Sequence, residues 1–361
     1  MSRLDIHSII AKVKGVSLKE KIIFTRNLAL IIRAGMSLPQ GLETLSIQTS
    51  SPMLKMIIGQ IKEAVIKGKD FSGALALYQN IFTNFYISMV KTGEASGNLE
   101  KVLENLAVSM EKERSLRSKI VGALIYPSVI VVLMVVVVII MMVFIIPRLT
   151  QVFRDFNAKL PLMTRVIIAI SEFLSAHFFL LVAFLIGVPL ALWYFFFRVP
   201  KGRVAFSWLT LHIPVFNALV KKVNTARIAR TLQTLISSGV PIVKSLEITS
   251  EVLQNHYYRA MLSKAQDEVV KGKLLSDIFK EYPNLYPAVG TQLIAVGEET
   301  GALDQILKDT ADFYEEEVDE ATKNLSSLVE PVLMIIIGVG VGILALSILQ
   351  PIYSISSSIH I

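Results

Sequence analysis

A seven-residue segment occurs twice in this chain, at a separation that the rest of the sequence keeps. Residues 93–99 read Gly-Glu-Ala-Ser-Gly-Asn-Leu, and residues 297–303 read Gly-Glu-Glu-Thr-Gly-Ala-Leu. Under the same offset of 204 residues (297 − 93), identical residues also coincide at Arg26 and Arg230, Gly35 and Gly239, Lys67 and Lys271, and Tyr78 and Tyr282. A constant register over about a hundred residues indicates an internal duplication, and two copies this long are two domains rather than a stacked solenoid.

Both copies have the pattern of a helical domain. Apolar residues recur at helical spacing at Phe24, Leu28, Ile31 and Ile32, and again at Ile228, Leu232, Leu235 and Ile236. Gly35 and Gly239 follow these stripes as expected C-terminal caps, because glycine adopts a left-handed backbone at little cost. Hydroxyl side chains are expected to cap the helices that follow, at Ser37, at Ser72 and Ser276, and at Ser96 and Thr300.

The repeated motif Gly-Glu-x-x-Gly-x-Leu is the first candidate site. Its members are Gly93, Glu94 and Gly97 in the first copy and Gly297, Glu298 and Gly301 in the second. One interpretation is a tight turn whose glutamate lies near a helix start, where the dipole favours negative charge by about 0.3–1 kcal/mol. The other is contact with a partner, which is suggested by the retention of the glutamate while its neighbours differ, but the turn is the stronger interpretation.

Three runs without Asp, Glu, Lys or Arg are long enough to cross a bilayer, and they are residues 120–146, 173–197 and 331–350. The hydrophobic content of 53% also exceeds that of an ordinary soluble protein. Within the third run, Gly338 and Gly342 have the Gly-x-x-x-Gly spacing that lets two membrane helices pack closely. The absence of charged residues inside the runs argues against a transporter or proton relay.

The distribution of basic residues predicts the topology. Of the 36 Lys and Arg residues, 17 lie in residues 1–119, 15 in residues 198–330, 4 in residues 147–172 and none after residue 350. Since basic residues collect on the cytoplasmic side, both repeats and the N-terminus are expected in the cytoplasm, with an external C-terminus. The predicted parts are a short N-terminal segment (1–17), the first cytoplasmic repeat (18–119), a transmembrane helix (120–146), an external loop (147–172), a second transmembrane helix (173–197), the second cytoplasmic repeat (198–330), a third transmembrane helix (331–350) and an external tail (351–361).

The two copies differ in charge. Residues 24–119 hold 12 basic and 8 acidic side chains, a net +4, whereas residues 228–323 hold 9 basic and 16 acidic ones, a net −7. The contrast is greatest just before the membrane, between the basic residues Lys112, Arg114, Arg117 and Lys119 and the acidic residues Glu315, Glu316, Glu317, Asp319 and Glu320. We expect these stretches to attract each other, within one chain or across a dimer. The alternatives are plain solvated helix faces, with the basic one also suited to anionic lipid headgroups.

No catalytic, cofactor or metal site is predicted from the residues. The chain has no cysteine, and its five histidines are neither repeated nor at metal-ligand spacing. The Lys-Gly-Lys turns at 67–69 and 271–273 lack the upstream glycine and the hydroxyl of a phosphate-binding loop. The net charge of +7 is read as a topology signal, so no nucleic-acid partner is expected. A membrane enzyme or a multi-pass transporter of unknown substrate remains the alternative function.

Several motifs, in order, resemble those of the type II secretion system F proteins, which include the platform proteins of type IV pilus assembly. The resemblance covers about residues 18–351. It rests on Lys119-Ile120, Tyr126-Pro127 and Ile145-Ile146-Pro147 around the first run, on Leu160-Pro161-Leu162-Met163-Thr164-Arg165, on the duplicated glycine–glutamate motif, and on Arg-x-Leu-x-x-Leu-Ile-x-x-Gly from Arg230.

This resemblance implies an all-α integral membrane protein with two homologous six-helix cytoplasmic bundle domains and three transmembrane helices. It implies a non-enzymatic platform in the bacterial inner membrane. Such a platform engages a hexameric assembly ATPase, contacts pilin or pseudopilin subunits during their insertion or extraction, and meets other inner-membrane assembly proteins. A homo-oligomer is expected, with a dimer favoured.

Overall fold

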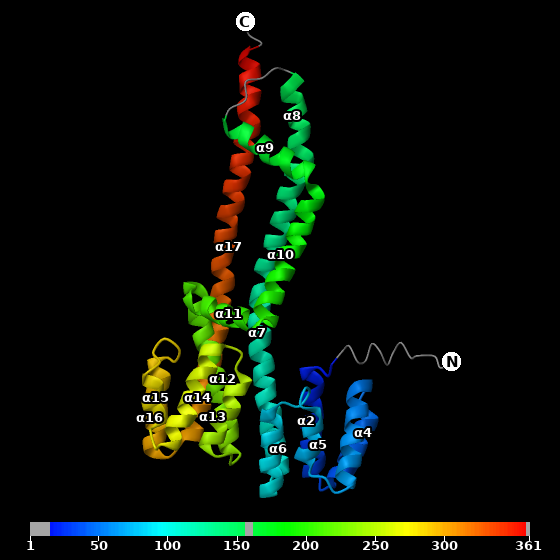
Figure 1. Cartoon of the computed structure of the whole chain (residues 1–361), viewed down its shortest axis with the longest axis vertical. Coiled ribbons are helices and arrows are strands. Elements are labelled where there is room, and N and C mark those ends of the chain that lie inside the picture. Colours follow the sequence, from blue (N-terminus) through cyan, green and yellow to red (C-terminus); the bar gives the residue numbers. More distant parts are fainter. Residues whose placement is uncertain (1–14, 156–161, 359–361) are drawn as a thin grey trace, which may run out of the picture. The chain divides into compact units, whose positions relative to one another are not determined.

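The computed structural model describes residues 15–155 and 162–358 (Figure 1). These residues form helices and no strand, as the sequence predicts. The chain divides into two compact units, Met1–Ser118 with Ser207–Asp319 and Lys119–Phe206 with Glu320–Ile361. The first unit holds both repeats and the second holds most of the apolar segments. The start of the predicted N-terminal segment, the Leu160-Pro161 pair and the last three residues of the predicted tail lie outside the described residues.

Each repeat has six α-helices, and the first also has a short 3-10 helix (Ala76–Tyr78), which confirms the predicted bundle. The first repeat has α2 (Leu18–Arg33), α3 (Leu38–Gln48), α4 (Pro52–Ile66), α5 (Phe71–Leu75), α6 (Asn84–Ser96) and the start of α7 (Leu99–Ile140). The second has α12 (Pro214–Ser237), α13 (Ile242–Val252), α14 (His256–Val270), α15 (Leu275–Lys280), α16 (Ala288–Thr300) and the start of α17 (Leu303–Ser358). From α3 onward, each helix of the first repeat has a counterpart that begins 204 residues later in the chain, so the duplication holds at the level of structure.

Local capping explains where several of these helices begin and end. The Ser17 amide donates to Glu20 Oε2 at 2.7 Å and the Glu20 amide donates to Ser17 Oγ at 3.2 Å, a capping box that starts α2. The Ser37 amide donates to Gln40 Oε1 at 3.3 Å ahead of α3. Gly35 and Gly239 have φ of +82° and +88° after α2 and α12, so the expected glycine caps are confirmed.

The predicted apolar stripes form the two cores. Phe24 and Leu28 are buried in the first core, and Ile228 and Leu232 are buried in the second. Helices far apart along the sequence contribute to each core because each helix has only one apolar face to bury. Burial of each large side chain contributes about 1.5–3 kcal/mol.

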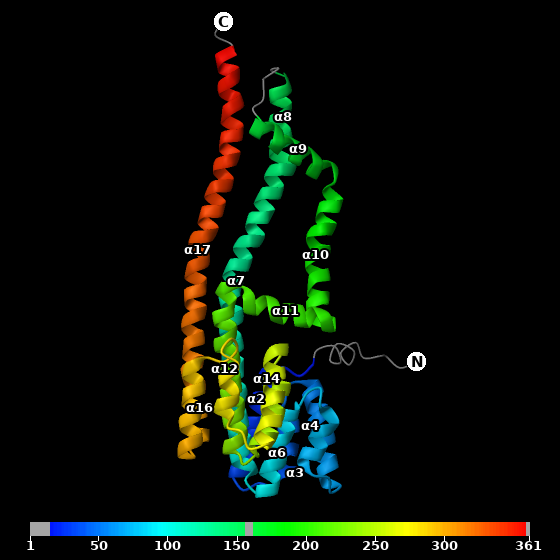
Figure 2. The ribbon, with the colours of Figure 1, turned by 60° about the vertical axis from the view of Figure 1, so that its left-hand side comes forward.

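The second unit contains the apolar part of α7, a π-helical turn (Met141–Ile145), α8 (Ile146–Asp155), α9 (Leu162–Ala176), α10 (Phe178–Arg198), the start of α11 (Pro200–His212) and the apolar part of α17. Figure 2 shows α11 turning sharply away from the axis of α10. The Ser171 hydroxyl donates to the Met142 carbonyl, and the Ser175 hydroxyl donates to the Val143 carbonyl at 3.5 Å. A π turn displaces carbonyl groups from the ordinary helical ladder, and α9 supplies donors for two of them.

One segment and two boundaries differ from the sequence expectation. The stretch expected as an external loop is largely helical, because α8 and α9 occupy most of it. The second apolar helix begins at Phe178 rather than at residue 173, since His177 has φ of −113° and ψ of 32° and separates α9 from α10. The last helix also continues to Ser358, into the part expected as a tail.

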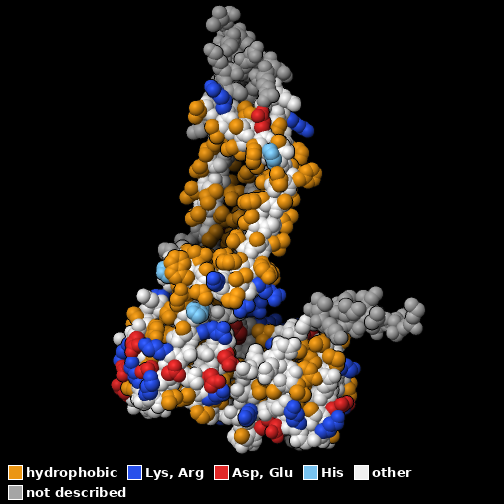
Figure 3. Space-filling model, viewed as in Figure 1, with side chains coloured by type: hydrophobic (Ala, Val, Ile, Leu, Met, Phe, Trp, Pro, Cys, Tyr) orange, Lys and Arg blue, Asp and Glu red, His pale blue; other side chains and the backbone are white. Residues whose placement is uncertain are grey.

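Within the described residues, three helices are long and apolar enough to cross a membrane, by length and composition: Leu99–Gln151, Phe178–Arg198 and Leu303–Ile343. A fourth arises if the bent pair Pro200–His212 and Phe216–Ser237 is counted as one span. Figure 3 shows hydrophobic side chains covering the apolar helices of the second unit, and charged side chains gathered on the repeats. Large apolar side chains exposed in this way, such as Val132 and Ile335, fit a lipid environment.

Candidate functional site

The repeated glycine–glutamate motif joins three helices in each repeat. Gly97 and Gly301 have φ of +69° and +70° and end α6 and α16 with the left-handed backbone that favours glycine. Leu99 and Leu303 then begin α7 and α17. The two glycines of the motif therefore have different functions, since Gly93 and Gly297 lie inside helices rather than in the turn.

Gly93 and Gly297 allow two helices to approach closely. A Cβ atom on Gly93 would lie 3.0 Å from Val102 Cβ and 3.2 Å from Leu99 Cα. A Cβ atom on Gly297 would lie 3.1 Å from Leu303 Cα. These separations are shorter than ordinary van der Waals contact, so a larger residue at either position would push the first turn of α7 or α17 away.

Glu94 and Glu298 cap short helices from a distance in the sequence. Glu94 accepts from the amides of Phe71 at 2.5 Å and Ser72 at 2.9 Å, which open α5. Glu298 accepts in the same way at α15, from Leu275 at 2.6 Å and Ser276 at 3.0 Å. Since the first amides of a helix have no partner inside it, one carboxylate satisfies two of them. This contact accounts for the retention of the glutamate, and contact with a partner stays a prediction.

The expected hydroxyl caps next to this motif are wrong. The Ser96 and Thr300 hydroxyls donate backward to the carbonyls of Thr92 and Val296, within α6 and α16. Ser72 and Ser276 are buried second residues of α5 and α15. In each case the glutamate of the motif, or the glycine turn, performs the capping that the hydroxyl was expected to perform.

The two repeats meet through a charged cluster, which we call the junction cluster: Lys112, Arg230, Asp312 and Glu315. Lys112 Nζ of the first repeat lies 2.8 Å from Glu315 Oε2 and 3.1 Å from Asp312 Oδ1 of the second. Arg230 Nε donates to Glu315 Oε1 at 2.9 Å, and its Nη2 donates to Asp312 Oδ1 at 2.5 Å. The side chains of Arg230 and Glu315 are only 11% and 13% exposed, a degree of burial at which charges need partners. Lys308 Nζ also lies 3.6 Å from Asp312 Oδ2, so three cations surround the two carboxylates of the cluster.

Further contacts extend the junction on both sides of this cluster. Arg227 binds Glu113 with two hydrogen bonds, of 3.0 and 2.7 Å, in the fork geometry that suits a carboxylate. Asn84 Nδ2 of α6 donates to Glu251 Oε2 of α13 at 2.8 Å. Apolar residues of the second repeat, Leu235, Val240 and Ile248, also pack into the core of the first repeat. The junction is therefore partly apolar and partly ionic.

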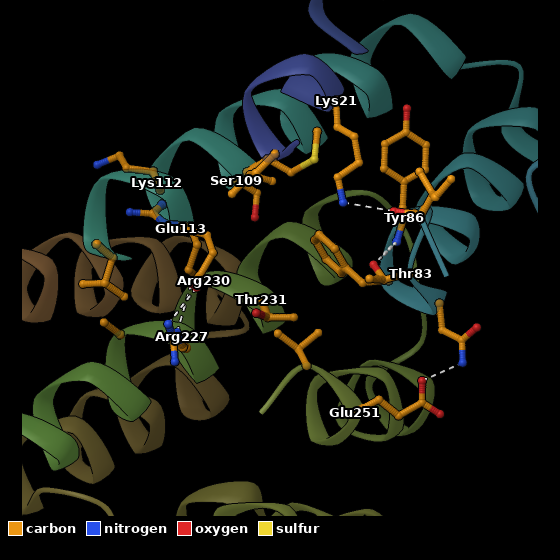
Figure 4. A pocket seen from close by; sticks show the side chains of 18 of the residues that line it. Lys21, Thr83, Tyr86, Ser109, Lys112, Glu113, Arg227, Arg230, Thr231 and Glu251 are labelled. Atoms are coloured by element: carbon orange, nitrogen blue, oxygen red, sulfur yellow. Dashed lines mark hydrogen bonds and ion pairs between the residues drawn. The ribbon is translucent and has the colours of Figure 1, made fainter. Parts of the chain in front are cut away.

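A cavity of about 460 Å³ lies at the junction, lined by both repeats (Figure 4). Arg227 and Arg230 reach it from α12, and Lys112 and Glu113 reach it from α7. Lys21 of α2 donates to the Ile81 carbonyl at 3.0 Å, and burial lowers the pKa of its amine below the ordinary value.

Tyr86 also lines the cavity, and its hydroxyl lies 2.9 Å from the Thr25 hydroxyl. Burial raises the pKa of the Tyr86 hydroxyl, and the hydrogen bond with Thr25 opposes this change. Tyr86 is thus a neutral hydrogen-bonding group at neutral pH.

The other charged residues singled out from the sequence lie outside the junction cluster. Arg114 and Arg117 are exposed on α7, and Glu316 and Glu320 are exposed on α17. Glu317 pairs with Lys222 of its own repeat at 2.6 Å. Lys119 and Asp319 are half-buried. Lys119 is the first residue of a segment of the second unit, and Asp319 is the last residue of a segment of the first unit. Among the nine residues predicted to attract across the repeats, Lys112 and Glu315 are in direct contact, at 2.8 Å.

Sequence reasoning missed Arg227, Glu113, Asn84 and Glu251. A signal for this region was nevertheless present, because Arg26 and Arg230 share one position of the repeat, as do Glu111 and Glu315. The structure pairs Arg26 with Glu111 at 2.5 Å, in the same way as Arg230 with Glu315. A basic and an acidic residue retained together in both copies indicate an ion pair inside each repeat.

Gly338 and Gly342 lie exposed on α17, one helical turn apart. Apart from the neighbouring backbone of α17 itself, a Cβ atom added at either position would meet nothing within 4 Å. The glycine pair is therefore open to a further helix, and its function in packing between chains stays a prediction.

We expect the Arg227→Glu substitution to loosen the junction by about 1–2 kcal/mol, because it replaces a two-bond ion pair by two facing carboxylates. Hydrogen exchange in α6 and α13 of the full-length protein should rise accordingly. Adding Glu113→Arg should restore protection. Lys244→Glu, which removes an exposed pair within α13, serves as the control. Equal loosening by the control would contradict the assignment.

A known protein family matches each of the two repeats separately. The sequence profile of the family described as type II secretion system (T2SS), protein F, matches residues 24–147 and again residues 228–351. Both matches run from the helices of a repeat into an apolar segment, so the duplicated unit includes both.

Relatives along nearly the whole length carry names from two machines. The chain is 37% identical to the type IV pilus assembly protein PilC of Thermus thermophilus, over 96% of this chain and 85% of the relative. It is 31% identical to the protein of the same name in Pseudomonas aeruginosa, over 97% and 93%. It is also 31% identical to the type II secretion system protein F of Pseudomonas aeruginosa, over 95% and 84%.

Proposed function

This chain belongs to the type II secretion system protein F family, and we propose that it is the inner-membrane platform of a type IV pilus or type II secretion machine. In this proposal the repeats face the cytoplasm and engage a hexameric assembly ATPase. The apolar helices meet pilin or pseudopilin subunits as they enter or leave the membrane. The names of the relatives support the assignment to a pilus or secretion machine. Two features of this chain support a coupling between the repeats and the membrane helices.

The observation that carries the proposal is that each repeat shares one uninterrupted helix with an apolar segment. Leu103 and Leu106 of α7 are buried in the first core, and α7 continues to Ile140 through apolar residues. Leu307 and Ala311 of α17 are buried in the second core, and α17 continues to Ser358. A displacement of a repeat therefore also moves a helix whose apolar part lies in the membrane. This arrangement needs no catalytic group in the chain itself.

The composition of the junction supports movement between the repeats. Ion pairs and a cavity of about 460 Å³ lie at the junction beside the apolar contacts that Leu235, Val240 and Ile248 make with the first core. Polar interfaces between domains of one chain commonly permit relative motion, whereas large apolar ones do not. We propose that an ATPase acting on one repeat shifts it against the other, and that the helices pass this shift to the membrane.

Locking the junction should stop assembly without removing the ATPase. The chain has no native cysteine, so Asn84→Cys with Glu251→Cys gives two unique thiols at side chains that now share a hydrogen bond. A short bis-methanethiosulfonate reagent should join them, and a thiol reductant should release them. The locked protein is expected to co-purify with the ATPase from membranes while pilus or pseudopilus assembly falls at least about tenfold, with recovery after reduction.

The controls are the two single-cysteine chains, which carry the same modification but no bridge. Normal assembly by the locked protein would contradict coupling through the junction. ATP hydrolysis by the purified chain alone, or failure of any assembly ATPase to co-purify, would contradict the platform function itself.

A further inference from the structure

Helix α11 leaves the axis of α10 at a tight corner (Figure 2). Val199 has the extended ψ of 129°, and Pro200 begins α11. Proline disfavours helical backbone at the residue before it, and α10 therefore ends at Arg198. Gly202 keeps the corner tight, because a Cβ atom there would lie 2.0 Å from the Phe195 carbonyl oxygen, far below an ordinary contact distance. A larger residue at this position would force α11 away from the end of α10.

Helix α11 is not half of a fourth membrane span. Its 13 residues extend about 20 Å, whereas the hydrocarbon core of a bilayer is about 30 Å thick. A bend of 110° separates it from Phe216–Ser237, the helix that would complete such a span. That second helix is part of the second repeat, since its Ile228 is buried in the core and its Arg227 and Arg230 form ion pairs. Helix α11 therefore needs another environment for its apolar residues.

Large apolar side chains of α11 are exposed. Val204, Phe206, Trp208 and Leu209 are 37%, 38%, 50% and 38% exposed. Val204 and Trp208 are four residues apart, so they lie on the same side of the helix, and Lys201 shares that side at the spacing of i, i+3 and i+7. Trp208 and a lysine with a long apolar stem are the residues that suit a boundary between acyl chains and water.

An aromatic band connects α11 with the end of α10. Trp193 and Tyr194, in the last turns of α10, are 54% and 60% exposed. Phe206 of α11 lies next to Phe196 and Phe197, with ring centroids 5.6 Å apart in both pairs. Because aromatic rings collect where acyl chains meet headgroups, this band marks one boundary of the span formed by α10. Helix α11 thus begins at the level of the headgroups.

The charge around this corner is entirely basic. Residues 173–246 contain no Asp or Glu. Arg227 and Arg230, later in this stretch, pair with acidic residues of the repeats. Arg198 and Lys201 are exposed, and neither forms an ion pair within residues 15–155 and 162–358. Unpaired cations beside exposed aromatic rings match the surface of a membrane that carries anionic lipids.

We propose that α11 is an interfacial helix, which lies in the headgroup layer of the membrane and binds anionic phospholipids. Val204 and Trp208 enter the boundary of the acyl chains, and Arg198 and Lys201 contact lipid phosphates. The inference rests on the proposed function in one respect, since it requires that α10 crosses the membrane. Only Ile213 separates α11 from α12, so this contact holds the first helix of the second repeat at the membrane surface.

Tryptophan fluorescence of the full-length protein tests the depth of α11. The chain has two tryptophans, so Trp193→Phe leaves only Trp208 of α11. The variant is reconstituted in vesicles of phosphatidylcholine and phosphatidylglycerol whose acyl chains carry bromine, a contact quencher, either near the headgroup or near the bilayer centre. Shallow bromine is expected to quench Trp208 at least about twofold more strongly than deep bromine. Equal or stronger quenching by deep bromine would place α11 inside a span and overturn the proposal.

The same variant tests the preference for anionic lipid. With bromine on one lipid class at a time, brominated phosphatidylglycerol should quench Trp208 about twofold more than an equal amount of brominated phosphatidylcholine. Arg198→Gln with Lys201→Gln should abolish this difference. The control is Lys67→Gln with Lys69→Gln, which removes the same charge from an exposed turn and should leave the difference unchanged. Equal quenching by the two lipids before any charge is removed, or a difference that survives the loss of Arg198 and Lys201, would overturn the binding of anionic lipid.

Trp193 distinguishes a failure of this inference from a failure of the proposed function. The converse variant, Trp208→Phe, leaves Trp193 of α10 as the only tryptophan. Quenching of Trp193 without quenching of Trp208 would overturn the interfacial position of α11 while α10 remains in the membrane. Absence of quenching at both positions would contradict the membrane span of α10, and with it the platform function.

Discussion

A chain carrying Glu94→Ala and Glu298→Ala is expected to lose about 2 kcal/mol of local stability at each of α5 and α15. Each substitution leaves two half-buried helix amides without an acceptor, and each such loss costs about 1–3 kcal/mol before water replaces part of it. Hydrogen exchange should therefore rise about 30-fold for the amides of Phe71 and Ser72 and for those of Leu275 and Ser276. The two sites lie in separate repeats, so their effects should add.

The adjacent residue provides the control for this prediction. Glu299 is exposed and belongs to the same motif, so Glu299→Ala should change exchange in α15 only slightly. The experiment also separates the two interpretations of the motif. If Glu94→Ala abolished co-purification with the assembly ATPase while exchange in α5 stayed at its original rate, the glutamate would contact a partner and its capping would be incidental.

The second large effect is expected at the glycine that precedes the glutamate. Gly93→Val or Gly297→Val should cost about 3 kcal/mol, because the new side chain has no room against Leu99 and Val102, or against Leu303 and Ile306. In scanning calorimetry of the full-length protein in detergent, the transition of the repeats should fall by about 6–12 °C. Separation of α6 from α7 would relieve the overlap, so the damage should concentrate there.

The same substitution at a glycine with open space supplies the comparison. Gly59 lies in the middle of α4, and a Cβ atom there would meet nothing within 4 Å. Gly59→Val should shift stability by no more than about 0.5 kcal/mol, since only helix propensity changes. Comparable losses at both positions would show that Gly93 is retained for a reason other than close packing.

The duplication and the helical spacing of apolar residues in each copy could be predicted from the sequence, because both are local or repeated properties of the chain. Helical stripes such as Phe24 and Leu28 depend only on spacing along the chain, and glycine caps such as Gly35 depend on one residue's backbone. Because the offset between the repeats is constant, each helix or cap predicted in the first repeat could also be predicted in the second. The apolar segments could be predicted from the length of each run without charged residues.

The position of Glu94 shows where such reasoning stops. Its partners lie 22 and 23 residues earlier, across a turn, and no rule of spacing connects a carboxylate to the start of another helix. The sequence places Glu94 close to the start of α7 and so suggests the dipole of that helix, whereas the structure places Glu94 at the start of α5. The sequence also suggests that Ser96 caps α7, but its hydroxyl donates to the Thr92 carbonyl within α6. Capping by a distant side chain is decided by how the helices pack.

The charge difference between the copies was visible in the sequence, but its consequence was not. Attraction between a basic and an acidic stretch does not specify which members meet, and the structure selects Lys112 with Glu315 while Arg114 and Glu316 face solvent. Successive residues of a helix point in different directions, so which charged residues pair depends on how α7 and α17 are rotated about their own axes.

The sequence by itself thus determined that this protein is two copies of one helical domain joined to apolar segments, because repetition and periodicity are written along the chain. Only the tertiary structure decided that the copies meet through unlike faces. Two equivalent domains can pack in many ways that bury similar area. The choice among them depends on contacts such as Asn84 with Glu251, between residues more than a hundred positions apart.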